Sequence, residues 1–247
     1  MKVSKRLGMA MALLVGSAAV AQAPAKPVKA GKQAAPPKLV VLLVVDQLGA
    51  DVLTKLEPRL GPKGIKRILG GTRFTDSTYR QLATYTGPGH ALLGTGVYPH
   101  KSGIVSNKYF DRTTGKSVTT LLDPANPLLE APADPEDDSS PNKLLAPTVG
   151  DLLKKKSPES KVVAVALKDR AAVLMAGHDG KAYWLSESTG KMTTSKYFES
   201  ALPGWVSDFN TKNPMDAQFG KVWERSQPAA KYTGPDDAGY EGDYKGL

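Results

Sequence analysis

Cysteine is absent from this sequence of 247 residues, and histidine occurs only three times, at His90, His100 and His178. Without cysteine the protein can form no disulfide bond, no thiolate ligand to a metal and no cysteine nucleophile. Its stability must therefore come from a buried apolar core or from a bound metal. The shortage of histidine also limits the number of imidazole ligands that such a metal could have.

No long run of positive charge occurs, although the formal net charge is +9. The lysines are scattered along the chain, and no cluster of them suggests a nucleic-acid groove. We therefore expect no nucleic acid as a structural partner. The excess charge is interpreted as a surface that keeps the protein soluble, with a mild attraction for anionic substrates as the alternative.

The first 21 residues have the composition of a secretory signal peptide. Lys2, Lys5 and Arg6 precede an apolar run over residues 7–20, and a small-residue cleavage site ends at Ala21. The run is too short to span a bilayer comfortably, and no later segment is apolar enough to do so. We expect cleavage after Ala21, no membrane span afterwards, and a periplasmic or secreted protein.

The rest of the chain divides by composition into a linker and one domain. Residues 22–37 contain mainly Pro, Ala and Lys and predict a solvated linker. Residues 38–247 are long enough for a single domain with a sizeable core. Within this domain, residues 122–142 are rich in Pro, Asp and Ser and predict a surface excursion. Residues 179–247 hold all three tryptophans and are interpreted as a cap-like insertion.

Two continuous apolar runs predict strands of the domain. Residues 38–46 and 161–167 are rich in Val, Leu and Ala and show no alternation, so both faces of each strand should be buried. Between them, residues 62–69 and 148–156 are predicted to be helices. The order strand, helix, helix, strand predicts an α/β fold with a mostly parallel sheet and helices on both of its faces.

Asp46 ends the first predicted strand, and Lys168 directly follows the second. In open α/β sheets the carboxyl ends of the strands are where ligands bind. A carboxylate that closes a buried strand needs a partner. Asp46 is therefore either a helix cap or salt-bridge residue, or an oxygen ligand for a divalent metal such as Zn²⁺.

Thr86 precedes Gly87, Pro88 and Gly89, a sequence typical of the start of a helix. One interpretation is a threonine that only caps this helix. The other is a nucleophile, because the free N–H groups and the positive dipole end of a helix favour an alkoxide and a phosphate group. The glycines would let the backbone approach a ligand closely.

Lys168 and Arg170 follow the second predicted strand, two residues apart. In an extended segment they would share one face and could clamp an anion; the alternative is ordinary surface charge. Asn107 lies 21 residues after Thr86 and could donate an amide hydrogen bond to a phosphoryl oxygen. The alternative for Asn107 is a turn asparagine, which its spacing alone favours.

As a set, these motifs resemble those of the alkaline phosphatase superfamily. The resemblance runs from about residue 39 to the end of the sequence. It is to bacterial alkaline phosphatases with a threonine nucleophile, which are related to the nucleotide pyrophosphatases/phosphodiesterases. The residues that carry it are Asp46, residues 86–90 (TGPGH), residues 98–103 (YPHKSG), Asn107 and residues 168–170 (KDR).

The resemblance implies a role for each of these residues. Asp46 would bind one of two Zn²⁺ ions, and Thr86 would contact that metal and attack phosphorus to form a phosphothreonine. Asn107, Lys168 and Arg170 would contact the transferred phosphoryl oxygens, and in this family the Lys/Arg pair marks monoesterases. The implied protein is an exported, zinc-dependent alkaline phosphatase that hydrolyses small phosphate esters.

The sequence also departs from the pattern of the family. The family's two-metal site needs an Asp with a His four residues later, an adjacent Asp-His pair and a further His, and none of these occurs here. We expect the chain to be the N-terminal portion of a longer enzyme, with its fold incomplete at the C-terminus. The alternatives are a phosphodiesterase or nucleotide pyrophosphatase of the same superfamily, and a catalytically inert truncated chain.

Overall fold

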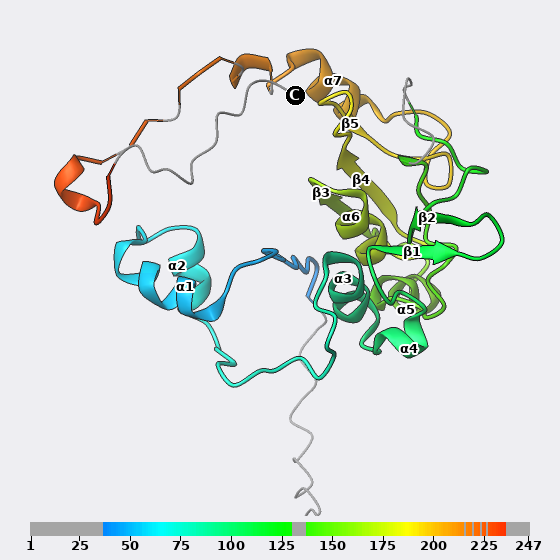
Figure 1. Ribbon diagram of the computed structural model, residues 1–247, viewed down its shortest axis with the longest axis horizontal. Helices are drawn as coiled ribbons and strands as arrows, with labels where there is room; N and C mark the ends of the chain where they lie inside the picture. The colour runs from blue at the N-terminus through cyan, green and yellow to red at the C-terminus, as the bar shows by residue number, and fades with distance from the viewer. Residues whose placement is uncertain are drawn as a thin grey trace, which may run out of the picture. The chain divides into compact units, whose positions relative to one another are not determined.

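The computed structural model describes residues 37–129, 137–214, 216–218, 220–222, 224–225 and 227–235 (Figure 1). The predicted signal peptide and residues 22–36 of the predicted linker lie outside these ranges. Contacts between residues divide the chain into two units, residues 1–47 and residues 48–247. Within the described residues, no helix combines the length and the apolar character that crossing a bilayer requires.

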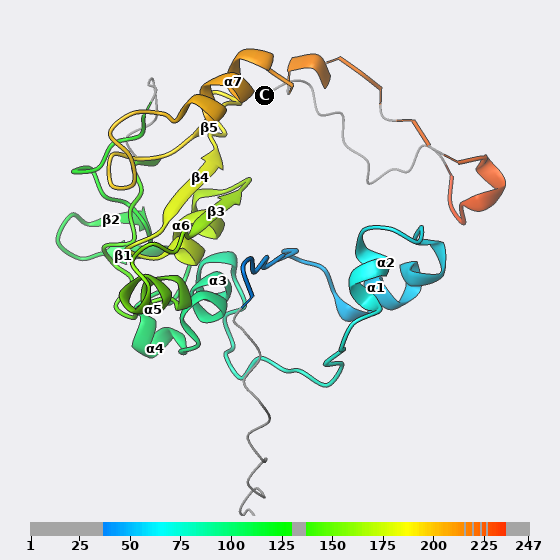
Figure 2. The same cartoon turned by 180° about the vertical axis from the view of Figure 1, so that it is seen from behind.

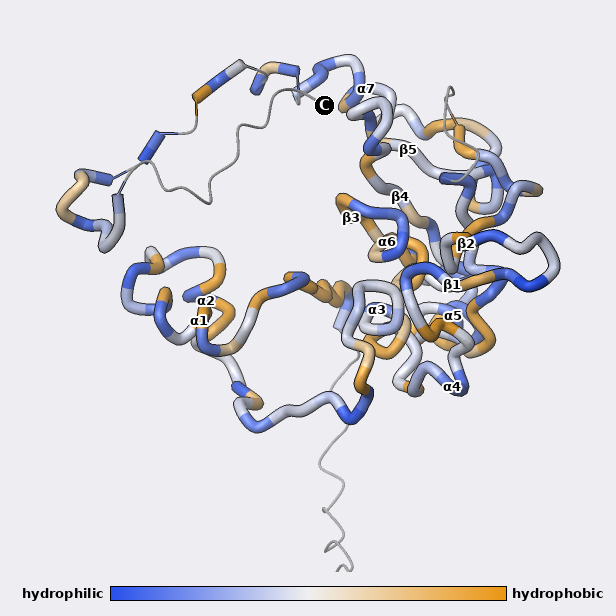
Figure 3. Tube along the Cα trace, viewed as in Figure 1, coloured by the Kyte–Doolittle hydropathy of each residue, from blue (hydrophilic) through white to orange (hydrophobic). Residues whose placement is uncertain are grey.

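The strand predicted over residues 38–46 does not form, so this expectation was wrong. Residues 39–45 have no regular secondary structure, and residues 46–47 form a turn. The apolar side chains of residues 39–45, a hydrophobic run in Figure 3, are exposed by 36% at Val44 to 78% at Leu39. A strand forms only where a neighbour pairs with its N–H and C=O groups, and none of the described residues pairs with this run.

A sheet does form in the second unit, with the strand order β3-β4-β5. Its strands are β3 (Val163–Ala166), β4 (Lys181–Leu185) and β5 (Met192–Thr193). β3 pairs parallel with β4, and β5 pairs antiparallel with β4. The strand predicted over residues 161–167 is thus confirmed in a shorter form, but its predicted burial on both faces is wrong. β3 lies at the sheet edge and exposes Val163 by 58% and Val165 by 59%.

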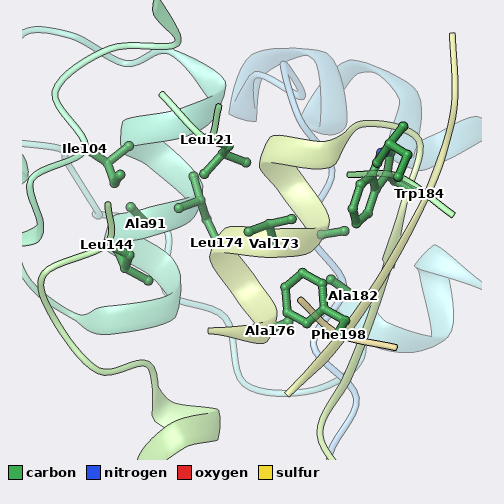
Figure 4. Close-up of a cluster of buried hydrophobic side chains, with 12 residues drawn as sticks. Ala91, Ile104, Leu121, Leu144, Val173, Leu174, Ala176, Ala182, Trp184 and Phe198 are labelled. Atoms are coloured by element: carbon green, nitrogen blue, oxygen red, sulfur yellow. The ribbon is translucent and has the colours of Figure 1, made fainter. Parts of the chain in front are cut away.

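The main core of the described residues lies between two helices and this sheet. Helix α6 (Asp169–Ala176) packs against β3, β4 and helix α3 (Thr86–Thr95) (Figures 1 and 2). Ala91 of α3, Leu174 of α6 and Trp184 of β4 belong to one buried apolar cluster (Figure 4). A Cβ on Gly94 would lie 2.6 Å from the carbonyl oxygen of Leu174, so glycine permits the close approach of α3 and α6.

Both predicted helices are present. Helix α5 (Val149–Lys156) follows Thr148, whose hydroxyl accepts a hydrogen bond from the N–H of Asp151 while the Asp151 carboxylate accepts one from the N–H of Thr148. This reciprocal capping explains why α5 begins there. The helix predicted over residues 62–69 is present as α2 (Ile65–Leu69). It follows α1 (Ala50–Leu56) and the 3-10 helix η1 (Glu57–Arg59), and none of the three contains a buried residue.

The segment predicted as a surface excursion, residues 122–142, follows an antiparallel hairpin. The elements before it are α4 (Pro99–Ser102), β1 (Lys108–Asp111) and β2 (Lys116–Thr119). The described part of the segment is anchored and not a loose excursion: Ser139 and Ser140 are buried. The carboxylate of Asp123 accepts hydrogen bonds from Ser140 and Asn142, because the buried end of the segment must satisfy its polar groups.

Residues 179–247 contribute a strand to the sheet near their start. β4 lies within residues 179–247 and pairs with β3, so the region interpreted as a cap-like insertion shares the sheet of the domain. A second buried cluster consists of Tyr183 of β4, Met192 of β5 and Val206 of helix α7 (Gly204–Lys212). This cluster packs α7 against the sheet. The short 3-10 helices η3 (Asp216–Gln218) and η4 (Ala229–Lys231) follow. The α/β class is confirmed, and the cap assignment stays a prediction.

Candidate active site

Thr86 is the first residue of α3, at the helix start that the sequence predicts. Tyr85 before it has an extended backbone, with φ −72° and ψ 162°, and Gly87 and Pro88 complete the first turn. Proline suits this turn because its missing N–H would have no partner within the helix. The hydroxyl of Thr86 is therefore in the same turn as the free N–H groups and the positive end of the helix.

Asn107 reaches the same end of α3. The N–H of Gly87 donates a hydrogen bond of 2.7 Å to Oδ1 of Asn107, twenty residues further along the chain. This contact orients the amide, because its oxygen is occupied by Gly87 and its NH₂ group is the part that can still donate. A Cβ on residue 87 would lie 3.1 Å from Oδ1, so glycine permits the approach. The structure thus links Asn107 to the residue that follows Thr86.

His90 supports the first turn of α3 from within the helix. Its side chain is buried, and its Nδ1 lies 2.8 Å from the carbonyl oxygen of Thr86. A carbonyl oxygen only accepts, so Nδ1 carries the hydrogen and donates it. The four-residue spacing of Thr86 and His90 in a predicted helix is the sequence signal that indicates this contact.

Lys168 and Arg170 lie at the start of α6, not on an extended segment. Lys168 is the N-cap residue and the helix begins at Asp169, so the prediction that both cations share one face of a strand is wrong. An acidic residue is favourable in a first helical turn, which explains why α6 begins directly after Lys168. Both cations nevertheless line one cavity of about 70 Å³, together with Thr119, Asp137, Asp169 and Glu187.

Each cation has an acidic neighbour. Nζ of Lys168 is 3.3 Å from Oε1 of Glu187, and both side chains are more than half exposed. Nη1 of Arg170 is 3.2 Å from Oδ1 of Asp169 in a pair that is at most 20% exposed. Exposed ion pairs contribute roughly 0–1 kcal/mol because water and salt screen them. The side chain of Arg170 is therefore held more firmly than that of Lys168.

The β1–β2 hairpin connects the two parts of the site. The N–H of Thr120 donates a 3.0 Å hydrogen bond to the carbonyl oxygen of Asn107, and Thr119 lines the cavity of the two cations. A hydroxyl at a helix start, an oriented amide and two cations thus occur on connected elements. Such a set can bind an anionic phosphoryl group. No sequence motif indicates Thr119, because its place in the cavity depends on a hairpin that the sequence pattern does not predict.

Asp46 belongs to the unit of residues 1–47. It is exposed and lies in a turn, so the prediction that it closes a buried strand is wrong. Gln47, the next residue, has a φ of 59°, in the left-handed region that residues other than glycine seldom adopt. Backbone strain of this kind concentrates at functional sites, which agrees with the candidate role of Asp46.

The described residues do not by themselves make a zinc site. Among them, no group of three or more His, Cys, Asp or Glu side chains could hold a metal ion. A structural zinc site has about four ligands, and a catalytic one has about three from protein. The donor set within the described ranges is therefore too small for zinc.

The histidines have other contacts in the structure. Nδ1 of His178 lies 3.2 Å from Oδ2 of Asp151, and the backbone N–H of His178 donates a 2.8 Å hydrogen bond to Oδ1 of the same carboxylate. The ring of His100 stacks on that of Tyr98, with 6.5 Å between the centroids. His90 is hydrogen-bonded to the backbone of its own helix. Each of the three histidines therefore contacts another protein group in the described part of the chain.

Comparison with known proteins identifies relatives of this chain. The type I phosphodiesterase/nucleotide pyrophosphatase family matches residues 40–235. Alkaline phosphatase PafA of Elizabethkingia meningoseptica is 38% identical over 80% of this chain and 37% of its own length. Alkaline phosphatase PhoV of Synechococcus elongatus is 34% identical over 98% of this chain and 46% of its own length. The chain thus spans less than half the length of these curated relatives.

The fold also matches solved structures. The crystal structure of wild-type PafA has a TM-score of 0.78 and 38% identity, over 85% of this chain and 41% of that chain. A PafA mutant, in which a threonine is replaced by serine and an asparagine, a lysine and an arginine by alanine, has a TM-score of 0.73 and 33% identity. It covers 81% of this chain and 40% of that chain. The chain therefore belongs to the type I phosphodiesterase/nucleotide pyrophosphatase family, within the alkaline phosphatase superfamily.

Proposed function

We propose that the protein containing this chain is an exported, zinc-dependent phosphate monoester hydrolase of the alkaline phosphatase type that acts through a phosphothreonine. The observation that carries this proposal is the start of α3, where Thr86 begins the helix and Asn107 is hydrogen-bonded to the N–H of Gly87. Two relatives that match most of this chain are named alkaline phosphatases, which supports the same class of reaction.

The PafA mutant supports the assignment of the site residues. The threonine and the asparagine replaced in it are 21 residues apart, as Thr86 and Asn107 are. The lysine and the arginine replaced in it are two residues apart, as Lys168 and Arg170 are. The same four residue types at these spacings, in a chain of similar fold, support a shared site.

In the proposed reaction, Oγ of Thr86 attacks phosphorus. A bond forms between that oxygen and phosphorus, the ester bond to the leaving group breaks, and the proton of the hydroxyl passes through water to the leaving oxygen, which departs as an alcohol. Water then attacks the phosphothreonine, which releases inorganic phosphate and restores the hydroxyl. The positive end of α3 stabilises the threonine alkoxide, while Asn107, Lys168 and Arg170 bind the phosphoryl oxygens on which charge is concentrated.

Zinc, when bound, would supply Lewis-acid stabilisation of negative charge on oxygen. Asp46 and Thr86 are the residues of this chain that would hold it through oxygen. The described residues lack a group that completes the ligand set, so the zinc dependence rests on the resemblance to the family and not on the geometry.

Phosphodiester hydrolysis is the second candidate, favoured by the family that matches residues 40–235. A phosphate monoester carries two negative charges on three non-bridging oxygens, whereas a diester carries one charge on two. The two cations that line one cavity, Lys168 and Arg170, therefore favour the monoester. The third interpretation, a catalytically inert chain, is favoured by the small donor set for a metal.

The deciding experiment is capture of the phosphothreonine in the enzyme expressed from the complete gene. Acid-quenched enzyme mixed with an aryl phosphate should carry phosphate on Thr86, detected by mass spectrometry. Thr86→Ala should abolish this species and most turnover, and Thr86→Ser should retain part of both because it keeps the hydroxyl. Thr95→Ala, at the other end of α3, is the matched control and should leave turnover unchanged. Turnover of Thr86→Ala at the wild-type rate would overturn the proposal.

A further inference from the structure

Asp169 separates the two cations of the candidate site and is itself mostly buried. Its side chain is 16% exposed, and its Oδ1 is 3.2 Å from Nη1 of Arg170, whose side chain is 20% exposed. The pair of Lys168 and Glu187 is 52% and 73% exposed. Because solvent screens a shielded pair less than an exposed one, Asp169 constrains Arg170 more than Glu187 constrains Lys168.

The other carboxylate oxygen of Asp169 is contacted from a distant part of the chain. Oγ of Ser139, thirty residues earlier, lies 3.1 Å from Oδ2 of Asp169. Ser139 is fully buried, and its hydroxyl proton is shared with the carbonyl oxygen of Asp137, 2.8 Å away. The two oxygens of the Asp169 carboxylate thus have different partners, so a rotation of the carboxylate would lengthen at least one of these two contacts.

The segment that carries Ser139 is itself anchored. Ser139 forms an isolated β-bridge with Leu122, and the N–H of Ser140 donates a 3.1 Å hydrogen bond to the carbonyl oxygen of Leu121. Oδ1 of Asp138 accepts a 3.0 Å hydrogen bond from the N–H of Leu128. A series of contacts therefore runs from this anchored segment through Ser139 and Asp169 to Arg170.

Nε of Arg170 is a buried donor that has no hydrogen-bond partner among the described residues. Buried donors are nearly always paired, so this N–H is available to an acceptor in the cavity that Lys168 and Arg170 line. We propose that Asp169, oriented by Ser139, is a positioning residue that holds the guanidinium of Arg170 in place for the phosphoryl oxygens. This inference rests on the proposed function and adds two residues that act through Arg170.

A simpler role for Asp169 is stabilisation of α6 alone. An acidic residue in the first turn favours a helix, and Asp169 is the first residue of α6. In that role its contribution would not depend on Arg170. The two roles predict different results for a double mutant, so a mutant cycle can separate them.

The experiment measures kcat/KM for an aryl phosphate monoester in the enzyme expressed from the complete gene. The cycle consists of wild type, Asp169→Asn, Arg170→Ala and the double mutant; asparagine keeps the shape of aspartate without its charge. Asp169→Asn should lower kcat/KM about tenfold in wild type and hardly at all once Arg170 is absent, as expected for residues in contact. Ser139→Ala should give a smaller loss that also disappears in the Arg170→Ala background.

Asp51→Asn is the matched control, because Asp51 is an exposed carboxylate paired with Lys55. It should change kcat/KM in neither background. Equal losses from Asp169→Asn with and without Arg170 would assign Asp169 to the stability of α6 and overturn the inference. If Asp169→Asn fails to fold, as judged by its Tm, the Ser139→Ala cycle decides in the same way.

Failure of the proposed function gives a different result from failure of this inference. A folded wild-type enzyme that hydrolyses no monoester would overturn the proposed function. The same cycle, measured as the Kd for inorganic phosphate, would then decide the positioning role. If the effects of Asp169→Asn and Arg170→Ala on this Kd are not additive, the positioning role is supported. If they are additive, the role is overturned.

Discussion

At the scale of single residues, the candidate site depends on how one amide is oriented. Asn107 accepts a hydrogen bond from the N–H of Gly87 and so keeps its NH₂ group as a donor for an anion. His90 adds a hydrogen bond to the carbonyl oxygen of Thr86 in the same turn. Two short hydrogen bonds to the backbone therefore hold the side chains of Asn107 and His90 at the helix start that carries the hydroxyl of Thr86.

Gly87→Ala should disturb the site more than it disturbs the fold. The new Cβ would lie 3.1 Å from Oδ1 of Asn107, so the amide must shift. Because small misplacements at a catalytic site can cost about 100-fold, we expect kcat/KM to fall roughly 10- to 100-fold. Gly89→Ala is the matched control, since a Cβ there meets nothing within 4 Å. Equal losses of kcat/KM in the two variants would contradict the role of this contact.

Lys168→Ala and Arg170→Ala should reduce hydrolysis of monoesters far more than hydrolysis of diesters. Removing one donor of this kind typically lowers the rate by roughly 10²–10³-fold, and the extra charged oxygen of a monoester needs these cations more. The measurement is kcat/KM for an aryl monoester and a matching diester in the enzyme expressed from the complete gene. Lys212→Ala, on the exposed end of α7, is the control. Equal losses on both substrates would favour the phosphodiesterase.

At the scale of secondary-structure elements, Asp151 joins two helices. Its carboxylate caps α5 through Thr148 and also accepts 2.8 Å hydrogen bonds from the N–H groups of His178 and Asp179, just after α6. Burial opposes ionisation of this group, but the hydrogen bonds from Thr148, Asp179 and His178 prevail and hold the pKa of Asp151 below its usual value. The ionised form of Asp151 therefore stabilises the connection between α5 and α6.

Stability should consequently fall in acid as Asp151 is protonated. A carboxyl group with a lowered pKa in the folded state stabilises fully above its usual value of 3.8, and this contribution is lost as the pH falls through the folded value. Asp151→Asn should lower the free energy of unfolding near neutral pH by about 1–3 kcal/mol and reduce its dependence on pH below about 4. Urea denaturation from about pH 6 down to about pH 3 measures both effects. An unchanged pH dependence in Asp151→Asn would assign the acid sensitivity to other carboxyl groups.

The sequence predicts those elements whose start depends only on residues that are close together in the chain. The start of α3 follows from Thr86 with its Gly-Pro pair, and that of α5 from Thr148 with Asp151. The run over residues 38–46 satisfied the local rule for a buried strand, but a strand also needs a partner, and no described residue provides one. The contacts Gly87–Asn107 and Ser139–Asp169 join residues twenty and thirty positions apart, so no local pattern indicated them.

At the scale of the whole molecule, the proposed function requires more residues than the described part of this chain supplies. The chain covers 37% of the length of PafA and 46% of that of PhoV. No group of three or more potential metal ligands occurs among the described residues, whereas the proposed reaction needs zinc. The proposed activity is therefore assigned to the complete protein.

The 247-residue chain alone should accordingly be nearly inactive and bind zinc weakly. The assay uses an aryl phosphate at alkaline pH with excess zinc, and the enzyme expressed from the complete gene serves as the positive control. A turnover number within the usual enzyme range of about 1–1000 per second would contradict this expectation. Zinc affinity, measured by competition with a chelator, gives a second readout that does not depend on activity.

The exposed run of residues 39–45 also has a consequence for solubility. Its seven apolar residues contain neither proline nor charge, which is the composition of segments that stack into cross-β fibrils. Lys38 and Asp46 flank the run, and we expect these charges to oppose its self-association, as charged residues beside such a segment do. Asp46 would thereby have two roles: its proposed place in the metal site and protection of the chain against aggregation. A variant without this carboxylate would lose both at once, so its loss of activity would include a loss of soluble protein.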